Sequence, residues 1–218
     1  MKEAYFTKGN INSVAARMVQ KLPVLAQRDR RLSLQHSALL VLDMQNFFLD
    51  PSSHAYVPSA EAIIPNIQTL IDSYVNAGSM VVFTRHLNTP QDAGMMATWW
   101  RDTITSDSPL SLIVDAFDLP NSTVLEKSQY DAFYNTGLER MLHQNNVSQV
   151  VICGVMMHLC CETTARSAFV RGFEVFFTVD GTATYNLDYH MASLLNLSHG
   201  FAMPILVEEV RSEFEKKE

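Results

Sequence analysis

Short apolar runs alternate with amphipathic segments along most of this chain. The first apolar run, SALLVLDM at residues 37–44, meets polar residues only at its C-terminal end. Continuous runs of this kind are typical of strands that are covered on both faces, as in a parallel sheet. The segment that follows, 60–78, repeats apolar residues at helical spacing and ends at Gly78, which is a plausible helix stop.

The same alternation continues toward the C-terminal part of the chain. Further strands are predicted at 80–84, 122–127, 149–155, 173–180 and 203–209, and further helices at 136–146, 158–172 and 187–200. Strands that alternate with helices indicate an α/β fold, in which right-handed crossovers place helices on both faces of a parallel sheet. We therefore expect a three-layer α/β/α sandwich of Rossmann type with a mostly parallel six-stranded sheet.

The N-terminal part of the chain precedes this alternation. Residues 11–31 look like an amphipathic lead-in that is broken at Pro23. We therefore divide the chain into an N-terminal helix or arm at 1–34 and a main domain at 35–218.

Composition and charge narrow the class of protein. The chain has 218 residues, of which 47% are hydrophobic, and this suits one sizeable domain with a single core. The formal net charge of -7 argues against nucleic acid or an anionic membrane surface as the main partner. Three cysteines give no disulfide framework, and no signal peptide or apolar run long enough to span a bilayer is evident, so we expect a cytoplasmic protein.

Three reactive side chains fall at the ends of three predicted strands. Asp43 ends the first strand, Lys127 ends the third, and Cys160 lies near the start of the helix after the fourth. Ligands of parallel α/β sheets bind beyond the carboxyl ends of the strands. A helix N-terminus and a nearby lysine both stabilise a thiolate, so Cys160 is a candidate nucleophile and Asp43 a candidate general base.

Each of these residues also has an ordinary structural interpretation. A free cysteine is usually a small buried hydrophobic residue, an aspartate after a strand caps helices, and a lysine at a strand end is usually solvated. Cys161 competes with Cys160, but one step along a helix turns a side chain by about 100°, so the two cannot face the same pocket. Cys153, inside the fourth strand, is most simply core.

Four stretches in this order carry a resemblance to a known family. They are ALLVLDMQNFF (38–48), VVFTRH (81–86), LEKSQYDAF (125–133) and ICGVMMHLCCETTARSAFVRGF (152–173). Over residues 35–210 the chain resembles the isochorismatase-like cysteine hydrolases, a group that includes nicotinamidases, N-carbamoylsarcosine amidohydrolase and isochorismatases. The main domain is accordingly expected to be an isochorismatase-like hydrolase domain.

The resemblance implies a role for several residues. Asp43, Lys127 and Cys160 match the catalytic triad of the family, and Gln45 matches the glutamine of its aspartate-x-glutamine start. In the family, the peptide bond after the valine of the Gly-Val stretch is cis, which here is Val155–Met156. The amides of Met156 and Cys160 would then form an oxyanion hole. The resemblance also implies a homodimer or homotetramer.

The chain departs from the family pattern in two informative ways. Its GVMMHLCC and TTARSAF stretches look closest to the isochorismatase branch, yet true isochorismatases typically have glycine where this chain has Cys160. Nicotinamidases carry an Asp-x-His…His metal site, whereas the matching TRHLNTP stretch, with Arg85 and His86, has no such ligand set. We therefore expect no catalytic metal and no cofactor.

The leading functional hypothesis is hydrolysis of a C–N bond in a small amide, imide or carbamoyl compound through a Cys160 thioester. Vinyl-ether hydrolysis of an isochorismate-like substrate, with Asp43 as acid and Cys160 incidental, remains an alternative. So does a catalytically silent binding homologue that retains the fold. Activity that survives in a Cys160→Ala variant would favour vinyl-ether hydrolysis over the thioester route. A Cys160 thiol that is no more reactive than the other cysteines would favour the silent binding homologue.

A long connection supplies candidate substrate-binding residues. Residues 86–120 are long for a connection in a compact domain, and such connections are usually lids or binding loops. The aromatic residues expected to contact a small, partly apolar substrate are Phe48, Trp99, Trp100 and Tyr130. Arg85 and Arg101 are candidates to bind a substrate carboxylate. The tryptophans have an equally good alternative role at a subunit interface.

Overall fold

The computed structural model of the chain describes residues 1–23, 30–117 and 122–215. Its centre is a six-stranded sheet with the order β3-β2-β1-β4-β5-β6. Every neighbouring pair of these strands is parallel. The strands are β1 (Ser37–Leu42), β2 (Met80–His86), β3 (Thr123–Lys127), β4 (Gln149–Gly154), β5 (Glu174–Thr182) and β6 (Met203–Ile205). The expected fold class is confirmed.

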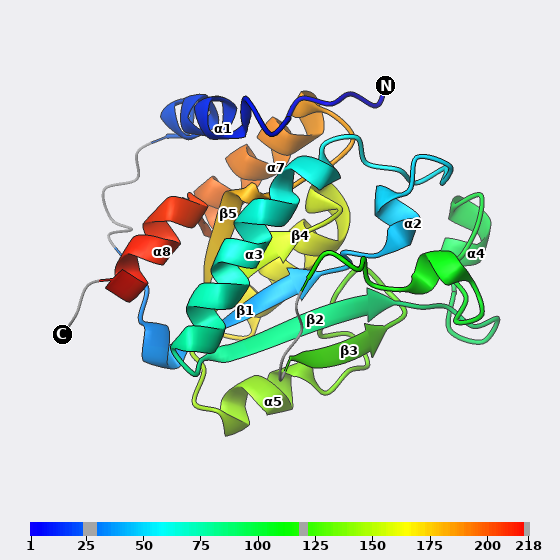
Figure 1. Cartoon of the computed structure of the whole chain (residues 1–218). Coiled ribbons are helices and arrows are strands. Elements are labelled where there is room, and N and C mark those ends of the chain that lie inside the picture. The colour runs from blue at the N-terminus through cyan, green and yellow to red at the C-terminus, as the bar shows by residue number, and fades with distance from the viewer. Residues whose placement is uncertain (24–29, 118–121, 216–218) are drawn as a thin grey trace.

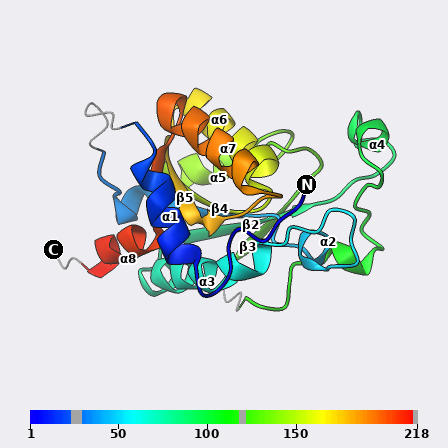
Figure 2. The same cartoon turned by 90° about the horizontal axis from the view of Figure 1, so that it is seen from above.

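Helices cover both faces of the sheet. The α-helices are α1 (Ile11–Gln20), α2 (Asn46–Leu49), α3 (Ala60–Asn76), α4 (Met96–Trp99), α5 (Leu138–Gln144), α6 (Glu162–Val170), α7 (Leu187–Gly200) and α8 (Val207–Glu215). In Figure 1 the long helix α3 runs across the strands, with α8 beside it. Seen from above in Figure 2, α6 and α7 lie on the opposite face from α3 and α8, so the molecule has three layers.

The core fills the space between the sheet and these helices. Strands β1 and β4 are buried along their whole length because they lie in the middle of the sheet. The N-terminal arm contributes to the same core: Phe6, Ile11, Ala15 and Met18 are buried in it, and α1 contacts β5. Residues 6–18 therefore pack against the rest of the core through apolar side chains.

The C-terminal part of the chain corrects one predicted element. A single strand over 203–209 was expected, but the strand ends at Ile205 and helix α8 begins at Val207. Two carboxylates stabilise this helix start: Glu209 accepts a hydrogen bond from the Leu206 N–H, and Asp180 accepts one from the Val207 N–H. Side chains that accept from the first helical N–H groups stabilise a helix start, which an apolar run alone does not reveal.

The strand order places a ligand site at one edge of the sheet. The chain builds β1, β2 and β3 outward in one direction and then returns to add β4 on the other side of β1. The carboxyl ends of β1 and β4 thus flank a topological switch point, where open α/β sheets bind ligands. Gly154 makes the close approach there possible, because its φ is 112° and a Cβ atom would lie 2.1 Å from the Leu42 carbonyl oxygen.

Candidate active site

Four polar side chains meet at the carboxyl ends of four neighbouring strands. Lys127 ends β3, His86 ends β2, Asp43 follows β1, and Cys160 lies in the turn between β4 and α6. Because the strands are parallel and adjacent, their ends bring together residues that are far apart in the sequence. Three members of this group, Asp43, Lys127 and Cys160, were expected from the sequence, whereas a part for His86 was not.

Asp43 is fully buried and its carboxylate is held from both sides. Its φ of 50° turns the chain at the end of β1, a conformation that aspartate tolerates better than most residues. One oxygen, Oδ1, accepts a hydrogen bond of 2.6 Å from the Thr84 hydroxyl. The other, Oδ2, lies 2.7 Å from the Lys127 Nζ. Burial favours the neutral acid, but the Lys127 ammonium, together with smaller contributions from His86 and Cys160, outweighs burial and lowers the pKa of the Asp43 carboxyl.

The Lys127 ammonium links the carboxylate to the thiol. Its side chain is fully buried, and Nζ lies 3.5 Å from the Cys160 Sγ and 2.9 Å from the Gln129 carbonyl oxygen. Burial would lower the pKa of this amine, but Asp43 and Cys160 outweigh burial and raise it. The pair is therefore a buried carboxylate–ammonium ion pair at neutral pH.

Cys160 lies in a π-helical turn, η4 (Met157–Cys161), that precedes α6. Such turns are frequent at functional sites. The thiol is 4% exposed, and burial followed by the nearby Asp43 carboxylate raises its pKa, whereas Lys127 opposes the rise. The resting form of Cys160 is therefore the thiol, and the stable thiolate expected from the sequence is not supported.

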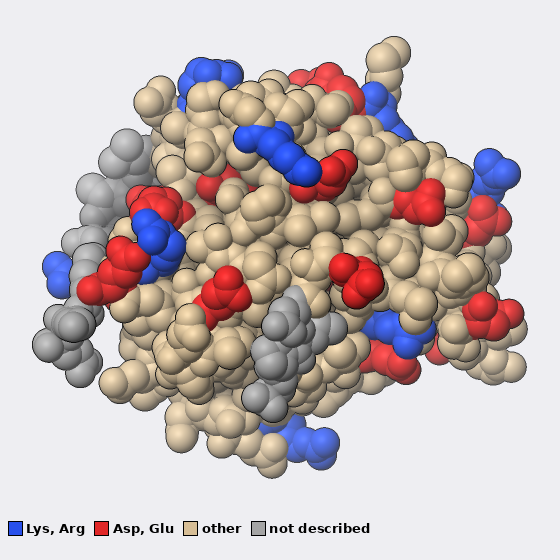
Figure 3. Space-filling model, in the orientation of Figure 1, with Lys and Arg blue, Asp and Glu red and all other residues tan. Residues whose placement is uncertain are grey.

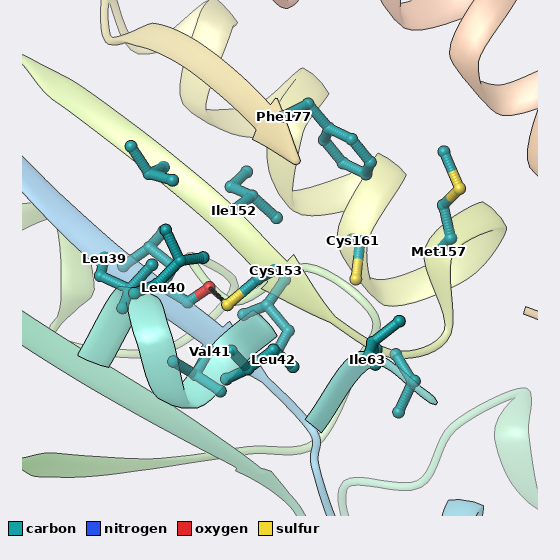
Figure 4. Close-up of a cluster of buried hydrophobic side chains, with 14 of the residues drawn as sticks. Leu39, Leu40, Val41, Leu42, Ile63, Ile152, Cys153, Met157, Cys161 and Phe177 are labelled. Carbon is teal, nitrogen blue, oxygen red and sulfur yellow. Dashed lines mark hydrogen bonds between the residues drawn. The ribbon is translucent and has the colours of Figure 1, made fainter. Parts of the chain in front are cut away.

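The other two cysteines belong to the core. Figure 4 shows Cys153 and Cys161 among aliphatic and aromatic side chains, with the Cys153 Sγ directed at the Leu40 carbonyl oxygen at 3.6 Å. Burial raises the pKa of both thiols. Their placement agrees with the expectation that Cys160 and Cys161 face different surroundings.

Cys160 lines a cavity that is partly open to solvent and whose space, with the solvent at its mouth included, is about 490 Å³. Aromatic and aliphatic side chains form most of its wall. Its lining includes Phe47, Phe48, His54, Met96, Trp100, Tyr130, Met156, Leu159 and Tyr185. His54 and Asp102 form a pair of 3.1 Å between Nδ1 and Oδ2, and both line the cavity. The cavity therefore offers apolar walls, a few polar groups and a reactive sulfur.

Most of the predicted site residues reach this cavity. Phe48, Trp100, Tyr130 and Met156 line it, and the Trp100 indole N–H donates a hydrogen bond of 2.7 Å to the Tyr130 hydroxyl. The Val155–Met156 peptide bond is cis. Trp99, by contrast, is 75% exposed and does not line the cavity.

Gln45 and the two arginines lie elsewhere. The Gln45 amide is fully buried, accepts from the His86 N–H and donates to the carbonyl oxygens of His86 and Ser111. It therefore holds the end of β2 and does not face the cavity. Arg85 donates to Ser111 and pairs with Glu126, and Arg101 pairs at 3.7 Å with Asp102. Neither arginine lines the cavity.

Across the described ranges, one group of side chains has the spacing of metal ligands. Ligand atoms of Asp43, His86 and Cys160 all lie within 4.8 Å of one another. The Lys127 ammonium contacts all three residues, at 2.7 Å, 3.3 Å and 3.5 Å. A metal ion among these ligands would be repelled by that ammonium, and the donor set therefore does not fit a resident metal ion.

Charged side chains are dispersed over one face of the molecule (Figure 3). On the face shown in Figure 3, acidic and basic residues are interspersed and form no continuous basic area. Within the described part of the chain, no helix has the length and apolarity needed to cross a bilayer.

Comparison with known proteins gives a consistent result. The isochorismatase domain model matches residues 37–209. Nicotinamidase 3 of Arabidopsis thaliana is 39% identical over 189 residues, which cover 84% of this chain and 91% of that protein. Enterobactin synthase component B of Escherichia coli (strain K12) is 30% identical over 81% of this chain, which spans 62% of the length of that longer protein.

Solved structures are similar in fold. A cysteine hydrolase from Pseudomonas syringae pv. phaseolicola superposes with a TM-score of 0.83 at 24% identity, over 89% of this chain and 98% of that one. A pyrazinamidase of Pyrococcus horikoshii, solved in complex with zinc, gives a TM-score of 0.71 at 26% identity, over 78% of this chain and 99% of that one.

Proposed function

The chain belongs to the isochorismatase family of hydrolases, and from this premise we propose that it is a cysteine amidohydrolase that cleaves the C–N bond of a small uncharged amide. The observation that carries this proposal is the contact of Lys127 with both Asp43 and Cys160, since Cys160 also lines an apolar cavity. Asp43, Lys127 and Cys160 are the proposed catalytic residues.

In the proposed first step, Cys160 adds to the amide carbonyl carbon while its proton moves to Asp43. The proton transfer leaves the summed charge of the three groups unchanged, from thiol, carboxylate and ammonium to thiolate, acid and ammonium. No net charge is created in a buried site, where creating one is expensive. Because the proton leaves the thiol during the step, the mechanism does not require a thiolate at rest. It is therefore compatible with the raised pKa of the Cys160 thiol.

The remaining steps return every group to its starting state. The tetrahedral adduct expels ammonia or an amine, which takes the proton from Asp43, and a thioester remains on Cys160. Water then adds to the thioester with Asp43 as base, and the acid product leaves as the thiol is restored. Backbone N–H groups of Met156 and Cys160 are the proposed donors to the oxyanion, since both residues line the cavity.

Charge at the cavity favours an uncharged substrate. Among the described residues, no lysine or arginine lines the cavity, and Asp102 lies at its lining with a formal negative charge. A substrate carboxylate would find no cation there, which argues against the vinyl-ether hydrolysis of the carboxylate-bearing isochorismate. The Arabidopsis relative is named a nicotinamidase, and nicotinamide, a flat uncharged carboxamide, is therefore the first substrate to test.

The proposal is tested by ammonia release from a panel of small carboxamides, with nicotinamide, benzamide and a carbamoyl compound as starting members. We expect release with at least one flat carboxamide, and loss of it in Cys160→Ala. Cys161→Ala, a change at the neighbouring core position, serves as the matched control and retains activity. Turnover that survives in Cys160→Ala would refute the thioester route.

A further inference from the structure

His86 lines the cavity together with Asn88, and its contact with Lys127 is a feature that the proposed triad does not explain. Its ring is 5% exposed and lies at the end of β2, between the strands that carry Asp43 and Lys127. The Lys127 Nζ lies 3.3 Å from the His86 Nδ1. The ring nitrogen is a neutral nitrogen acceptor for this ammonium, beside the Asp43 carboxylate, the Cys160 thiol sulfur and the Gln129 carbonyl oxygen.

The tautomer of His86 follows from its second nitrogen. Nε2 lies 3.1 Å from the Asn88 Oδ1, and the Asn88 Nδ2 donates a hydrogen bond of 2.9 Å to the Ser128 carbonyl oxygen. With its amide nitrogen used as donor, Asn88 presents its oxygen to His86, so Nε2 carries the proton. Nδ1 therefore has a free electron pair, and it points at an ammonium that can only donate.

We infer that His86 is a positioning residue of the proposed amidase, which as a neutral Nδ1 acceptor holds the Lys127 ammonium between Asp43 and Cys160. The ring remains neutral because burial, together with Lys127, lowers the pKa of His86 to about 4. Gln45 supports the arrangement by hydrogen bonding both the N–H and the C=O of His86. The inference depends on the proposed function only for its kinetic readout.

Three substitutions of His86 test the contributions of its two ring nitrogens separately. Asparagine places an oxygen near the position of Nδ1, glutamine extends toward the position of Nε2, and leucine supplies neither. We expect His86→Leu and His86→Gln to lower kcat about tenfold with little change in KM, a size typical of losing one hydrogen bond to a charged group. His86→Asn keeps most of kcat. The exposed His143, replaced by Asn, is the matched control.

A second readout needs no substrate. Iodoacetamide modification of Cys160, followed by peptide mapping, gives the pH dependence of thiol reactivity. The titratable side chains around Sγ are Asp43, Lys127, His86, Tyr130 and Cys161. Since Lys127 lowers the pKa of this thiol, His86→Leu and His86→Gln should shift the profile to higher pH. His86→Asn should not. This result is obtained even if no amide substrate is found, so it separates failure of this inference from failure of the proposed function.

Asn88→Leu provides a check away from the ammonium. It removes the acceptor that fixes the tautomer, and a smaller shift of the profile in the same direction is expected. Thermal unfolding of every variant identifies loss of fold. The inference is overturned if folded His86→Gln retains both kcat and the profile while His86→Asn loses them. Activity that disappears with a chelator and returns with Zn²⁺ would also overturn it, because His86 would then be a ligand.

Discussion

Asp43 divides its two carboxylate oxygens between different partners. The Thr84 hydroxyl donates to Oδ1 and also accepts a hydrogen bond of 3.0 Å from the Asp43 N–H. This arrangement fixes the rotation of the carboxylate and leaves Oδ2 toward Lys127 and the thiol. Thr84 is fully buried in β2 and does not itself reach the cavity, so its contribution to the reaction is through Asp43.

Thr84→Val should therefore impair chemistry more than binding. Valine keeps the shape of threonine but removes the hydroxyl, and loss of a hydrogen bond to a charged group predicts a fall in kcat of about tenfold. Steady-state ammonia release at several substrate concentrations gives kcat and KM separately. Thr84→Ser, which restores the hydroxyl, should recover most of kcat. Equal kcat values for valine and serine variants would contradict this role.

The residues at strand ends differ in how visible they are in the sequence. Asp43 and Lys127 are polar residues that end predicted strands, and Cys160 opens a predicted helix, so all three could be identified as candidates. His86 also follows an apolar run, but its partner Asn88 and the orientation of its ring depend on tertiary contacts. Gln45 was expected at the substrate, yet its amide hydrogen bonds the backbone at the end of β2.

Among the elements, side-chain hydrogen bonds connect the segment around α4 to the loop after β3. Trp100, directly after α4, donates to Tyr130, and Gln129 donates to the carbonyl oxygens of Asp92 and Ala93. These bonds hold the segment beside the cavity, where Met96 and Trp100 form part of the wall. The segment therefore covers part of the cavity, and its hydrogen bonds to the loop after β3 hold it in place.

Trp100 and Tyr130 should contribute to substrate binding through the hydrogen bond between them. Trp100→Phe and Tyr130→Phe each remove the hydrogen bond and keep an aromatic ring, and each should raise KM about fivefold, the equivalent of about 1 kcal/mol. The double variant should be no worse than either single one, because the same bond is lost. Trp99→Phe is the control, since that ring is exposed. Fully additive effects in the double variant would show that the two side chains do not act through this hydrogen bond.

The elements also show where periodicity stops being informative. Segments with strong periodicity, such as α3 and the central strands, form close to their predicted bounds. The connection after β2 has no period, so the sequence cannot decide which of two adjacent tryptophans faces the cavity; Trp100 does and Trp99 does not. Helix α8 was missed because its start depends on carboxylate capping across the chain.

At the scale of the whole molecule, two buried histidines couple folding to pH. Burial lowers the pKa of His86 to about 4, with Lys127 adding to the effect, and burial lowers that of His190 to about 3. An unfolded histidine has a pKa near 6.5. The unfolded chain therefore binds protons that the folded chain does not, and stability is lost as the pH falls below about 6.5.

The free energy of unfolding should accordingly decrease between pH 7.5 and pH 5.5. Each of the two histidines contributes about 1.3 kcal/mol to the decrease over this interval, as linkage predicts for these pKa values. The total decrease in the free energy of unfolding is measured by urea unfolding at the two pH values. In His190→Asn, whose amide oxygen lies near the position of Nδ1 and can still bond the Tyr5 hydroxyl, the decrease should be smaller by one such contribution. An unchanged decrease in that variant would show that His190 is not buried in its neutral form.

The proposed function depends on a thioester on Cys160, which acid-quenched turnover followed by intact-mass and peptide analysis would detect. During turnover of a carboxamide that releases ammonia, we expect a mass increase equal to the acyl group, located on Cys160. The increase should be absent in Cys160→Ala and retained in Cys161→Ala. Ammonia release by Cys160→Ala at the wild-type rate, with no acyl group on any cysteine of the wild-type chain, would contradict it.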